Sequence, residues 1–266
     1  MIAVSQIVDW MNSQAPLALS ESWDNTGLLL GDRSCEVKRV QTCLTLTPPS
    51  VQEAIDRQAN LVISHHPMPF KPLAKITTDE PTGNLLWKLA SHRISIYSPH
   101  TAWDSAEFGI NAMIAQRLSL KNTRPLVPSN IAGLENLGAG RWGELEQPAT
   151  MSQFCKLLRT VLPNCRLRGI EQGKPFSRVA IACGSGASLL PNAIRAGCDL
   201  FLTGEATFHN CLEAQAAGLS MVLVGHFSSE QFAMVELAKR IRQHFSEVDC
   251  WASESESDPV KDFHMY

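Results

Sequence analysis

Residues 61–67 form a short apolar run that ends in two histidines and a proline. Leu61-Val62-Ile63 has the length and composition of a buried strand, and Pro67 ends it. His65 and His66 therefore lie at the carboxyl end of a strand, where α/β proteins tend to bind their ligands. Neighbouring side chains of an extended chain point to opposite faces, so this pair suits two ions, or one ion and a substrate, better than a single ion.

Strand-like and helix-like segments alternate along the chain, which is typical of βαβ units and a largely parallel sheet. We therefore predict an α/β fold. The predicted strands are residues 40–46, 61–64, 94–98, 178–183, 200–202 and 221–224. The predicted helices are 4–11, one that opens at 51, and 84–91, 108–118, 151–162, 188–196, 208–217 and 230–245. Residues 125–143, rich in proline, glycine and asparagine, indicate a connection between two lobes.

The composition narrows the class of protein. The 266 residues are 44% hydrophobic, enough for one large domain or two small ones. A net charge of -3 argues against a general nucleic-acid binder. The N-terminus lacks the pattern of a secretory signal, and no apolar run is long enough for a membrane helix, so we expect a cytoplasmic protein without a membrane partner. The eight scattered cysteines are then expected to be reduced and to fill the core.

Polar side chains of metal-ligand type follow three of the predicted strands, those that end near residues 64, 98 and 224. Because the carboxyl ends of parallel strands meet at one edge of a sheet, we expect the three loops to converge in one crevice. A single strand-end histidine is more often a hydrogen-bonded structural residue, but three such ends together favour a metal site. The predicted ligands are His65, His66, Asp104, His226 and Glu230.

The third loop has a helical spacing of its own. If a helix starts near Phe227, His226 and Glu230 share one face, one turn apart. Ser228 or Ser229 would then cap that helix. A carboxylate that bridges two cations, with a histidine on one of them, fits this spacing.

The donor types indicate the chemistry. Imidazole and carboxylate ligands without thiolate suit zinc, manganese, iron or nickel. Three imidazoles and two carboxylates underfill two metals unless one carboxylate bridges, and water would fill the gaps. Water bound between two metals loses its proton near neutral pH and becomes a nucleophile, which is the chemistry of a hydrolytic site.

The roles of four further features stay open. His100 is a weak ligand, a general base or a donor that orients Asp104, and we favour the last two roles. The turn at residues 183–188 either cradles an anion or is simply a tight strand-to-helix connection. Glu205 either faces the predicted crevice or caps the next helix, and His209 is a weaker candidate for a place near a site.

Taken together, the motifs resemble the Nif-three-like family of dinuclear metal-centre hexameric proteins, often named GTP cyclohydrolase 1 type 2 homologues. The resemblance covers almost the whole chain, and the length fits the short form without an inserted domain. The motifs occur in the family's order, at residues 23–28, 64–67, 100–104, 203–205 and 225–230.

The resemblance implies two divalent metal ions that share Glu230 as a bridge. One ion also takes His65 and Asp104, and the other takes His66 and His226. It further implies two interleaved three-layer α/β lobes, with the metal site between them at strand carboxyl ends. A toroidal homohexamer with metal sites facing an inner cavity is implied as well.

With the connection at 125–143, the resemblance predicts a metal-binding lobe of residues 1–124 and 222–266 and a second lobe of residues 125–221. Two positions depart from the family's pattern. Thr45 stands where an acidic residue is common, and only His209 remains of two histidines that often follow the Thr-Gly-acid turn.

The predicted function is a metal-dependent hydrolase that acts on a nucleotide or a related phosphorylated small molecule, with Glu230 and His100 in catalytic roles. The alternative is a metal-handling, metal-delivery or regulatory protein without catalytic turnover, because the same ligands serve it equally well. The identity of the metal and the substrate stay open.

Overall fold

The computed structural model describes residues 1–261, which fall into two compact units. Unit 1 consists of Met1–Trp10, Asn25–Pro99 and the described residues from Met234 onward, and unit 2 of Met11–Asp24 and His100–Ala233. The division falls within two helices, α1 (Val4–Gln14) and α9 (His226–His244), so each of them contributes residues to both units.

Unit 1 is built on a five-stranded sheet with the order β15-β4-β5-β6-β2. Its strands run parallel except β2, which pairs antiparallel with β6 at one edge. The strands are β2 (Gly27–Leu30), β4 (Arg39–Cys43), β5 (Leu61–Ser64), β6 (Ser95–Ser98) and β15 (Asp249–Ala252). A separate two-stranded pair joins β1 (Ile2–Ala3) and β3 (Glu36–Val37).

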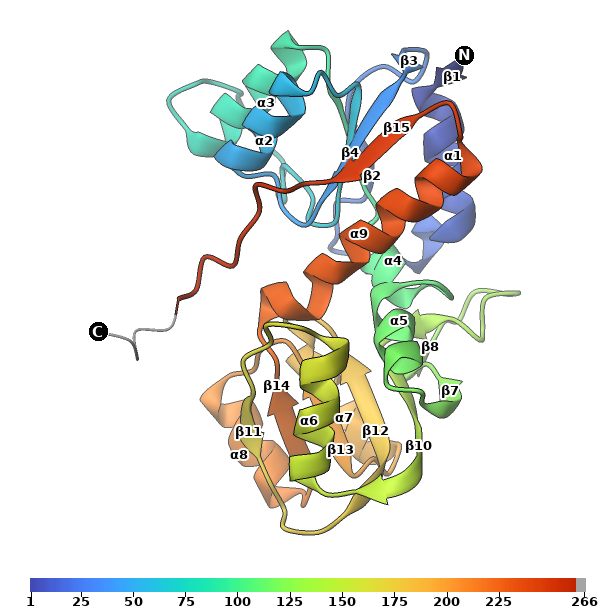
Figure 1. The fold of residues 1–266 in the computed structure, drawn as a ribbon, viewed down its shortest axis with the longest axis vertical. Helices are drawn as coiled ribbons and strands as arrows, with labels where there is room; N and C mark the ends of the chain where they lie inside the picture. The colour runs from blue at the N-terminus through green and yellow to red at the C-terminus, as the bar shows by residue number, and fades with distance from the viewer. Residues whose placement is uncertain (262–266) are drawn as a thin grey trace. The chain divides into compact units, whose positions relative to one another are not determined.

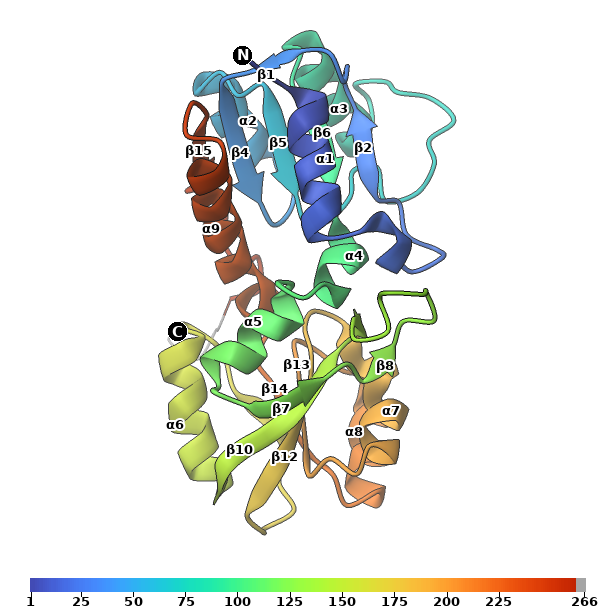
Figure 2. The same cartoon turned by 90° about the vertical axis from the view of Figure 1, so that its right-hand side faces the viewer.

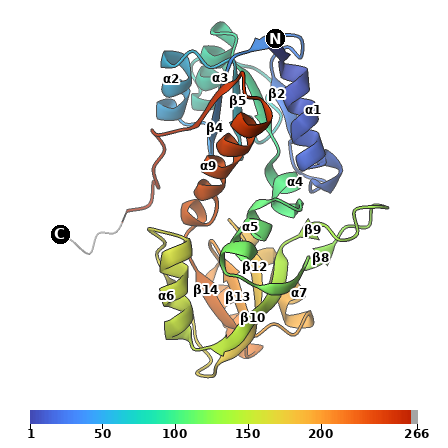
Figure 3. The same cartoon turned by 45° about the vertical axis from the view of Figure 1, so that its right-hand side comes forward.

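Helices cover both faces of this sheet (Figures 1 and 3). Helices α2 (Pro48–Asp56) and α3 (Pro81–Ser91) lie on one face, where Leu89 packs with the strand residues Val62 and Ile96 in the core. The unit 1 parts of α1 and α9 lie on the other face. Strands β5 and β6 are buried along their whole length, which agrees with the continuous apolar run Leu61-Val62-Ile63 in β5.

The segment before α2 differs from its prediction. Thr47-Pro48-Pro49-Ser50 was expected to separate strand and helix, but the two prolines form the first turn of α2. Proline is tolerated there because the first amides of a helix have no partner within the helix. Thr47 and Ser50 form a reciprocal capping box, in which the Thr47 hydroxyl accepts from the Ser50 amide at 3.3 Å.

Unit 2 is built on a six-stranded sheet with the order β11-β14-β13-β12-β10-β7. The three central strands β12, β13 and β14 are parallel, and β11, β10 and β7 pair antiparallel around them. The strands are β7 (Lys121–Arg124), β10 (Arg141–Ala149), β11 (Arg168–Ile170), β12 (Phe176–Ala182), β13 (Leu200–Thr203) and β14 (Ser220–Leu223), with a separate pair of β8 (Val127–Pro128) and β9 (Gly138–Ala139).

Unit 2 also has helices on both faces of its sheet (Figures 2 and 3). Helices α7 (Leu190–Arg195) and α8 (Phe208–Ala216) pack through Leu190 and Ala214 onto Phe201 and Met221. On the other face lie α5 (Ile110–Arg117) and α6 (Met151–Val161). The remaining elements are α4 (His100–Ser105) and two 3₁₀ turns, Leu17–Leu19 and Gly186–Leu189.

The α/β prediction is confirmed, and β5 has the predicted bounds. The expectation that three strand ends share one sheet edge is wrong. Strands β5 and β6 belong to the unit 1 sheet, whereas β14 pairs with β13 and β11 in unit 2. Strand length and polarity do not reveal which sheet a strand joins, because the pairing partner is distant in sequence.

The compact units divide the chain differently from the predicted lobes. Residues 100–124 and 222–233 group with unit 2, although the predicted metal-binding lobe includes them. The connection at 125–143 contains β8 and β9 and the first residues of β10. The predicted lobe bounds stay a prediction, and residues 262–266 lie outside the described part of the chain.

Among the described residues, no helix combines the length and apolar character that crossing a bilayer requires.

Replacing Thr47 by Ala should lower the free energy of unfolding by about 1 kcal/mol, because the hydroxyl that caps α2 is lost. Thr47→Ser keeps the hydroxyl and is the matched control. Urea unfolding of both variants measures the difference, and equal stability of the two would show that the capping box contributes nothing.

Candidate metal centre

The two adjacent histidines lie just beyond β5, in unit 1. Their amides donate to the carbonyls of Cys43 and Leu44, each at 2.9 Å. His65 is buried and His66 half-buried, and their ring centroids are 5.0 Å apart at an interplanar angle of 50°. The prediction that the rings point to opposite faces is wrong, because β5 ends at Ser64 and strand alternation no longer applies.

Thr45 is the immediate partner of His66. Its hydroxyl Oγ1 lies 2.7 Å from His66 Nδ1 and hydrogen-bonds to it. The Thr45 amide donates to Glu256 Oε1 at 2.8 Å, which holds this segment at the end of β4. With Nδ1 engaged, Nε2 is the His66 ring nitrogen suited to a metal. The position where the sequence departs from the family's pattern thus contacts a predicted ligand.

Asp104 lies on α4, in unit 2, and contacts the end of β12. Cys183 Sγ donates to Asp104 Oδ1 at 3.3 Å. The buried Asn111 joins the same two residues through their backbones: it donates to the Asp104 carbonyl at 3.1 Å and accepts from the Cys183 amide at 2.8 Å. These contacts hold α4 against β12.

The carboxylate of Asp104 lies in an electrostatically unfavourable environment. Although the residue as a whole is only half-buried, burial of its carboxyl group raises its pKa to about 7, and the negative charge of Glu230 adds to the shift. The charge of His100 and the thiol of Cys183 act in the opposite direction. A cation at this place would relieve the repulsion between the two carboxylates.

Helix α9 begins at His226 and carries Glu230 one turn later, as the spacing predicts. Glu230 is only 3% exposed, and its Oε2 lies 3.1 Å from His226 Nε2. Ser228 and Ser229 lie within the helix instead of capping it. The Ser229 hydroxyl donates to the His226 carbonyl at 2.7 Å and accepts from the Gly184 amide at 2.9 Å. This contact ties the start of α9 to the turn after β12.

The turn at 183–188 passes directly beside Glu230. Gly184 has φ of +57°, and a Cβ there would lie 2.2 Å from Glu230 Oε1. A side chain is therefore excluded by backbone conformation and by space. The neighbouring negative charge argues against the anion-cradle reading of this turn, because an anion would face Glu230.

Glu205 follows β13 and faces the same cluster. Its Oε1 accepts hydrogen bonds from His226 Nδ1 at 2.9 Å and from the Ser185 hydroxyl at 2.5 Å. Helix α8 is capped by Thr207, whose hydroxyl accepts from the Asn210 amide at 3.2 Å. The structure therefore favours the interpretation in which Glu205 faces the site over the one in which it caps α8.

His226 lies between two carboxylates. Burial alone would lower its pKa, but hydrogen bonds and charge from Glu230, and then from Glu205, raise it to about 9. The free ring is then doubly protonated at neutral pH. A metal ion at Nε2 would take the place of one proton.

His100 is paired with Asp24, a residue that the sequence marked only within a family motif. His100 Nδ1 lies 2.7 Å from Asp24 Oδ1, while Thr101 holds Asp24 Oδ2 through its hydroxyl at 2.5 Å and its amide at 3.1 Å. Burial would lower the pKa of His100, but its hydrogen bond to Asp24 and the negative charges of Asp104, Asp24 and Glu230 together raise the pKa. Asp24 thus engages His100 Nδ1, and the role of His100 as a donor that orients Asp104 stays a prediction.

His100 also has φ of +29°, an unusual conformation for a residue with a side chain. Such conformations occur preferentially at functional sites. Because Asp24 engages Nδ1, Nε2 is the ring nitrogen that can exchange a proton with another group. The structure thus supports the acid–base reading of His100.

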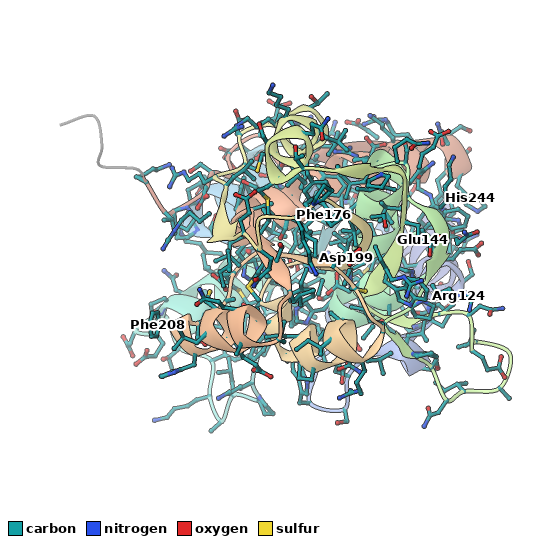
Figure 4. All side chains as sticks on the ribbon, turned by 90° about the horizontal axis from the view of Figure 1, so that it is seen from below. Arg124, Glu144, Phe176, Asp199, Phe208 and His244 are labelled. Atoms are coloured by element: carbon teal, nitrogen blue, oxygen red, sulfur yellow. The ribbon has the colours of Figure 1, made fainter. Side chains whose placement is uncertain are left out.

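The weaker candidate His209 lies at the start of α8 and is exposed. Its neighbour Phe208 is 72% exposed and lies at the outer edge of the molecule in Figure 4. His209 therefore stays the weaker candidate.

The spacing of His226 and Glu230 fits a shared metal ion. Zinc–nitrogen and zinc–oxygen bonds are about 2.0–2.2 Å long, so two ligands of one ion lie roughly 3.0–3.6 Å apart. The distance of 3.1 Å between His226 and Glu230, which form an ion pair without a metal, lies within this range. Within unit 2, His226 and Glu230 each offer a ligand atom of the right kind, so this histidine and glutamate pair could contribute to a metal site. Of the predicted ligands, His65 and His66 belong to unit 1, and Asp104, His226 and Glu230 to unit 2.

The raised pKa of Asp104 makes metal-free protein less stable as pH rises from about 5 to about 7. The folded state, with a pKa of about 7, binds more protons in this range than the unfolded state, whose value is 3.8, and stability falls with pH wherever this holds. Asp104→Asn should flatten this dependence. Urea unfolding of chelator-treated protein at several pH values measures it, and an unchanged slope in Asp104→Asn would contradict the electrostatic account.

Comparison with known proteins identifies the family. The family model described as Duf34/NIF3 (NGG1p interacting factor 3) matches residues 2–259. A protein of Clostridium acetobutylicum named GTP cyclohydrolase 1 type 2 homolog is 31% identical over 241 residues, which cover 90% of each chain. NIF3-like protein 1 of Drosophila melanogaster is 32% identical over 264 residues, which cover 97% of this chain and 88% of that protein.

Solved structures agree with this assignment. The crystal structure of Staphylococcus aureus protein SA1388 superposes with a TM-score of 0.89, at 26% identity, over 98% of this chain and 99% of that one. The match in fold and sequence therefore extends over both units. The chain belongs to the Duf34/NIF3 family.

Proposed function

We propose that this protein holds a dinuclear divalent-metal centre and is a metal-dependent hydrolase acting on a nucleotide or a related phosphorylated small molecule. The observation that carries the proposal is the pair His226 and Glu230, spaced at 3.1 Å, beside the enclosed carboxylate of Asp104. A metal site explains why these donor groups lie together, because bound cations would neutralise the negative charge of the carboxylates.

The proposed ligand assignment divides the five side chains between two ions. One ion takes His65, Asp104 and Glu230, and the other takes His66, His226 and Glu230 as the shared bridge. This assignment requires the two units to bring their ligands together. Zinc, iron, manganese and nickel all suit nitrogen and oxygen donors of this kind.

When bound, the ions supply Lewis acidity toward an oxygen atom of the substrate. The protein's own contribution is the movement and placement of protons. His100, held at Nδ1 by Asp24, presents Nε2 as an acid–base group. Glu230, almost fully buried, can accept a proton as well as bridge the ions.

The names of relatives support a nucleotide substrate. The Clostridium acetobutylicum relative carries the name GTP cyclohydrolase 1 type 2 homolog, which suggests hydrolytic opening of a purine ring. We extend only the class, hydrolysis of a nucleotide-like molecule, to this chain. The toroidal homohexamer and the cytoplasmic location stay predictions.

A metal-handling or regulatory role is the second candidate, and the exposure of His226 favours it. The His226 side chain is 34% exposed, so an ion held there would be accessible to exchange with a recipient. A hydrolase needs turnover with the metal retained, whereas a delivery protein needs transfer without turnover.

Elemental analysis of natively purified protein tests the centre directly. We expect about two divalent ions per chain, with both lost in Glu230→Gln because the bridge is removed, and about one lost in His65→Ala. The matched controls are Glu213→Gln and His209→Ala, which change exposed residues of the same types on α8. Full metal content in Glu230→Gln would contradict the assignment.

A substrate screen then separates the two functions. Metal-loaded protein should hydrolyse at least one nucleotide, phosphoester or cyclic amide, and Glu230→Gln should reduce the rate to background. If the loaded protein turns over none of these and instead transfers metal to a chelating recipient, the hydrolase reading is wrong and the metal-handling reading is supported.

A further inference from the structure

We propose that Glu205 is a positioning residue of the metal centre, whose carboxylate fixes the His226 ring so that Nε2 faces the metal and Glu230. This inference rests on the proposed metal centre and goes beyond it by naming a residue that is not itself a ligand. It assigns a role to the segment that directly follows β13.

The His226 ring is held at both of its nitrogens. Nδ1 lies 2.9 Å from Glu205 Oε1, and Nε2 lies 3.1 Å from Glu230 Oε2. Imidazole has only these two polar atoms, so the two carboxylates together determine its orientation. With Glu205 on Nδ1, only Nε2 remains for an ion shared with Glu230.

Glu205 is itself held in place, although its side chain is 57% exposed. Its amide donates to the Gly184 carbonyl at 3.0 Å, and the Ser185 hydroxyl donates to its Oε1 at 2.5 Å. The preceding Gly204 packs so closely that a Cβ there would lie 2.5 Å from the Gly184 carbonyl oxygen. The ends of β12 and β13 thus aim the Glu205 carboxylate at His226.

Glu205 is charged, whereas the partner of His66, the other partly exposed histidine among the predicted ligands, is neutral. His66 Nδ1 is bonded to the neutral hydroxyl of Thr45, whereas His226 Nδ1 is bonded to a carboxylate. A carboxylate on the remote nitrogen makes imidazole a stronger metal donor, and its loss typically lowers metal affinity by about 10-fold to 100-fold. Solvent exposure of Glu205 places the expected effect near the lower end of that range.

The test uses full-length protein and zinc, with affinity measured by competition against a chromophoric chelator. Glu205→Ala should weaken zinc binding by about tenfold or more. Glu205→Gln keeps an oxygen that can accept from Nδ1 but removes the charge, so its affinity should fall between wild type and Glu205→Ala. Ser185→Ala should cause a smaller loss, because it frees the carboxylate without removing it.

Nitrogen NMR of the His226 ring supplies a readout that a merely structural role would not move. In the zinc-loaded wild type, Nδ1 should carry the proton and Nε2 should be bound to the metal. In loaded Glu205→Ala the Nδ1 proton should exchange faster with solvent. Glu213→Gln, which makes the same charge change as Glu205→Gln on the exposed surface of α8, should leave both measurements unchanged.

The outcomes are distinguishable. If Glu205→Ala and Glu205→Gln bind zinc within about twofold of wild type, the positioning role is overturned while the metal centre stands. If loaded wild type shows zinc on Nδ1, the role is also overturned. If wild type binds no divalent metal at all, the proposed function itself fails. If Glu205→Ala unfolds, Glu205→Gln decides between these results.

Discussion

The electrostatic repulsion between the carboxylates of Asp104 and Glu230 is the constraint on which the site depends. Burial raises the pKa of Asp104 to about 7, and Glu230 adds to that shift while remaining only 3% exposed itself. Enclosed carboxylates at close range cost free energy unless protons or cations compensate for them. The protein nevertheless holds both groups in place, which a metal centre explains more simply than a purely structural role.

The scaffold holds these groups through backbone contacts and close packing. Asn111 ties the backbone of α4 to that of β12, and Ser229 ties the turn after β12 to the start of α9. Gly184 then permits an approach to Glu230 that no side chain would allow. Three elements distant in sequence are thereby fixed around one pair of carboxylates, and such rigid support is what precise ligand placement requires.

Features that depend on neighbouring residues in the chain were predicted well from the sequence, whereas strand pairing was predicted poorly. The apolar run of β5 and the helical spacing of His226 and Glu230 depend on neighbours in the chain, and both predictions agree with the structure. Strand β7 was not predicted, because its four residues are polar and exposed and it is defined only by pairing with β10. The same limit explains Asp24, which binds His100 from 76 residues away and shows no local signal of that contact. Alternation failed for the two adjacent histidines for a different reason: the strand ends at Ser64, as predicted, so its alternation does not extend to His65 and His66.

Anomalous diffraction from crystals of the zinc-loaded protein tests the central claim most directly, because it locates the ions instead of counting them. The account predicts two zinc peaks on either side of the Glu230 carboxylate, one of them within bonding distance of His226 Nε2. Zinc bound elsewhere, with the Glu230 carboxylate and the His226 ring left in contact with each other alone, would contradict the account.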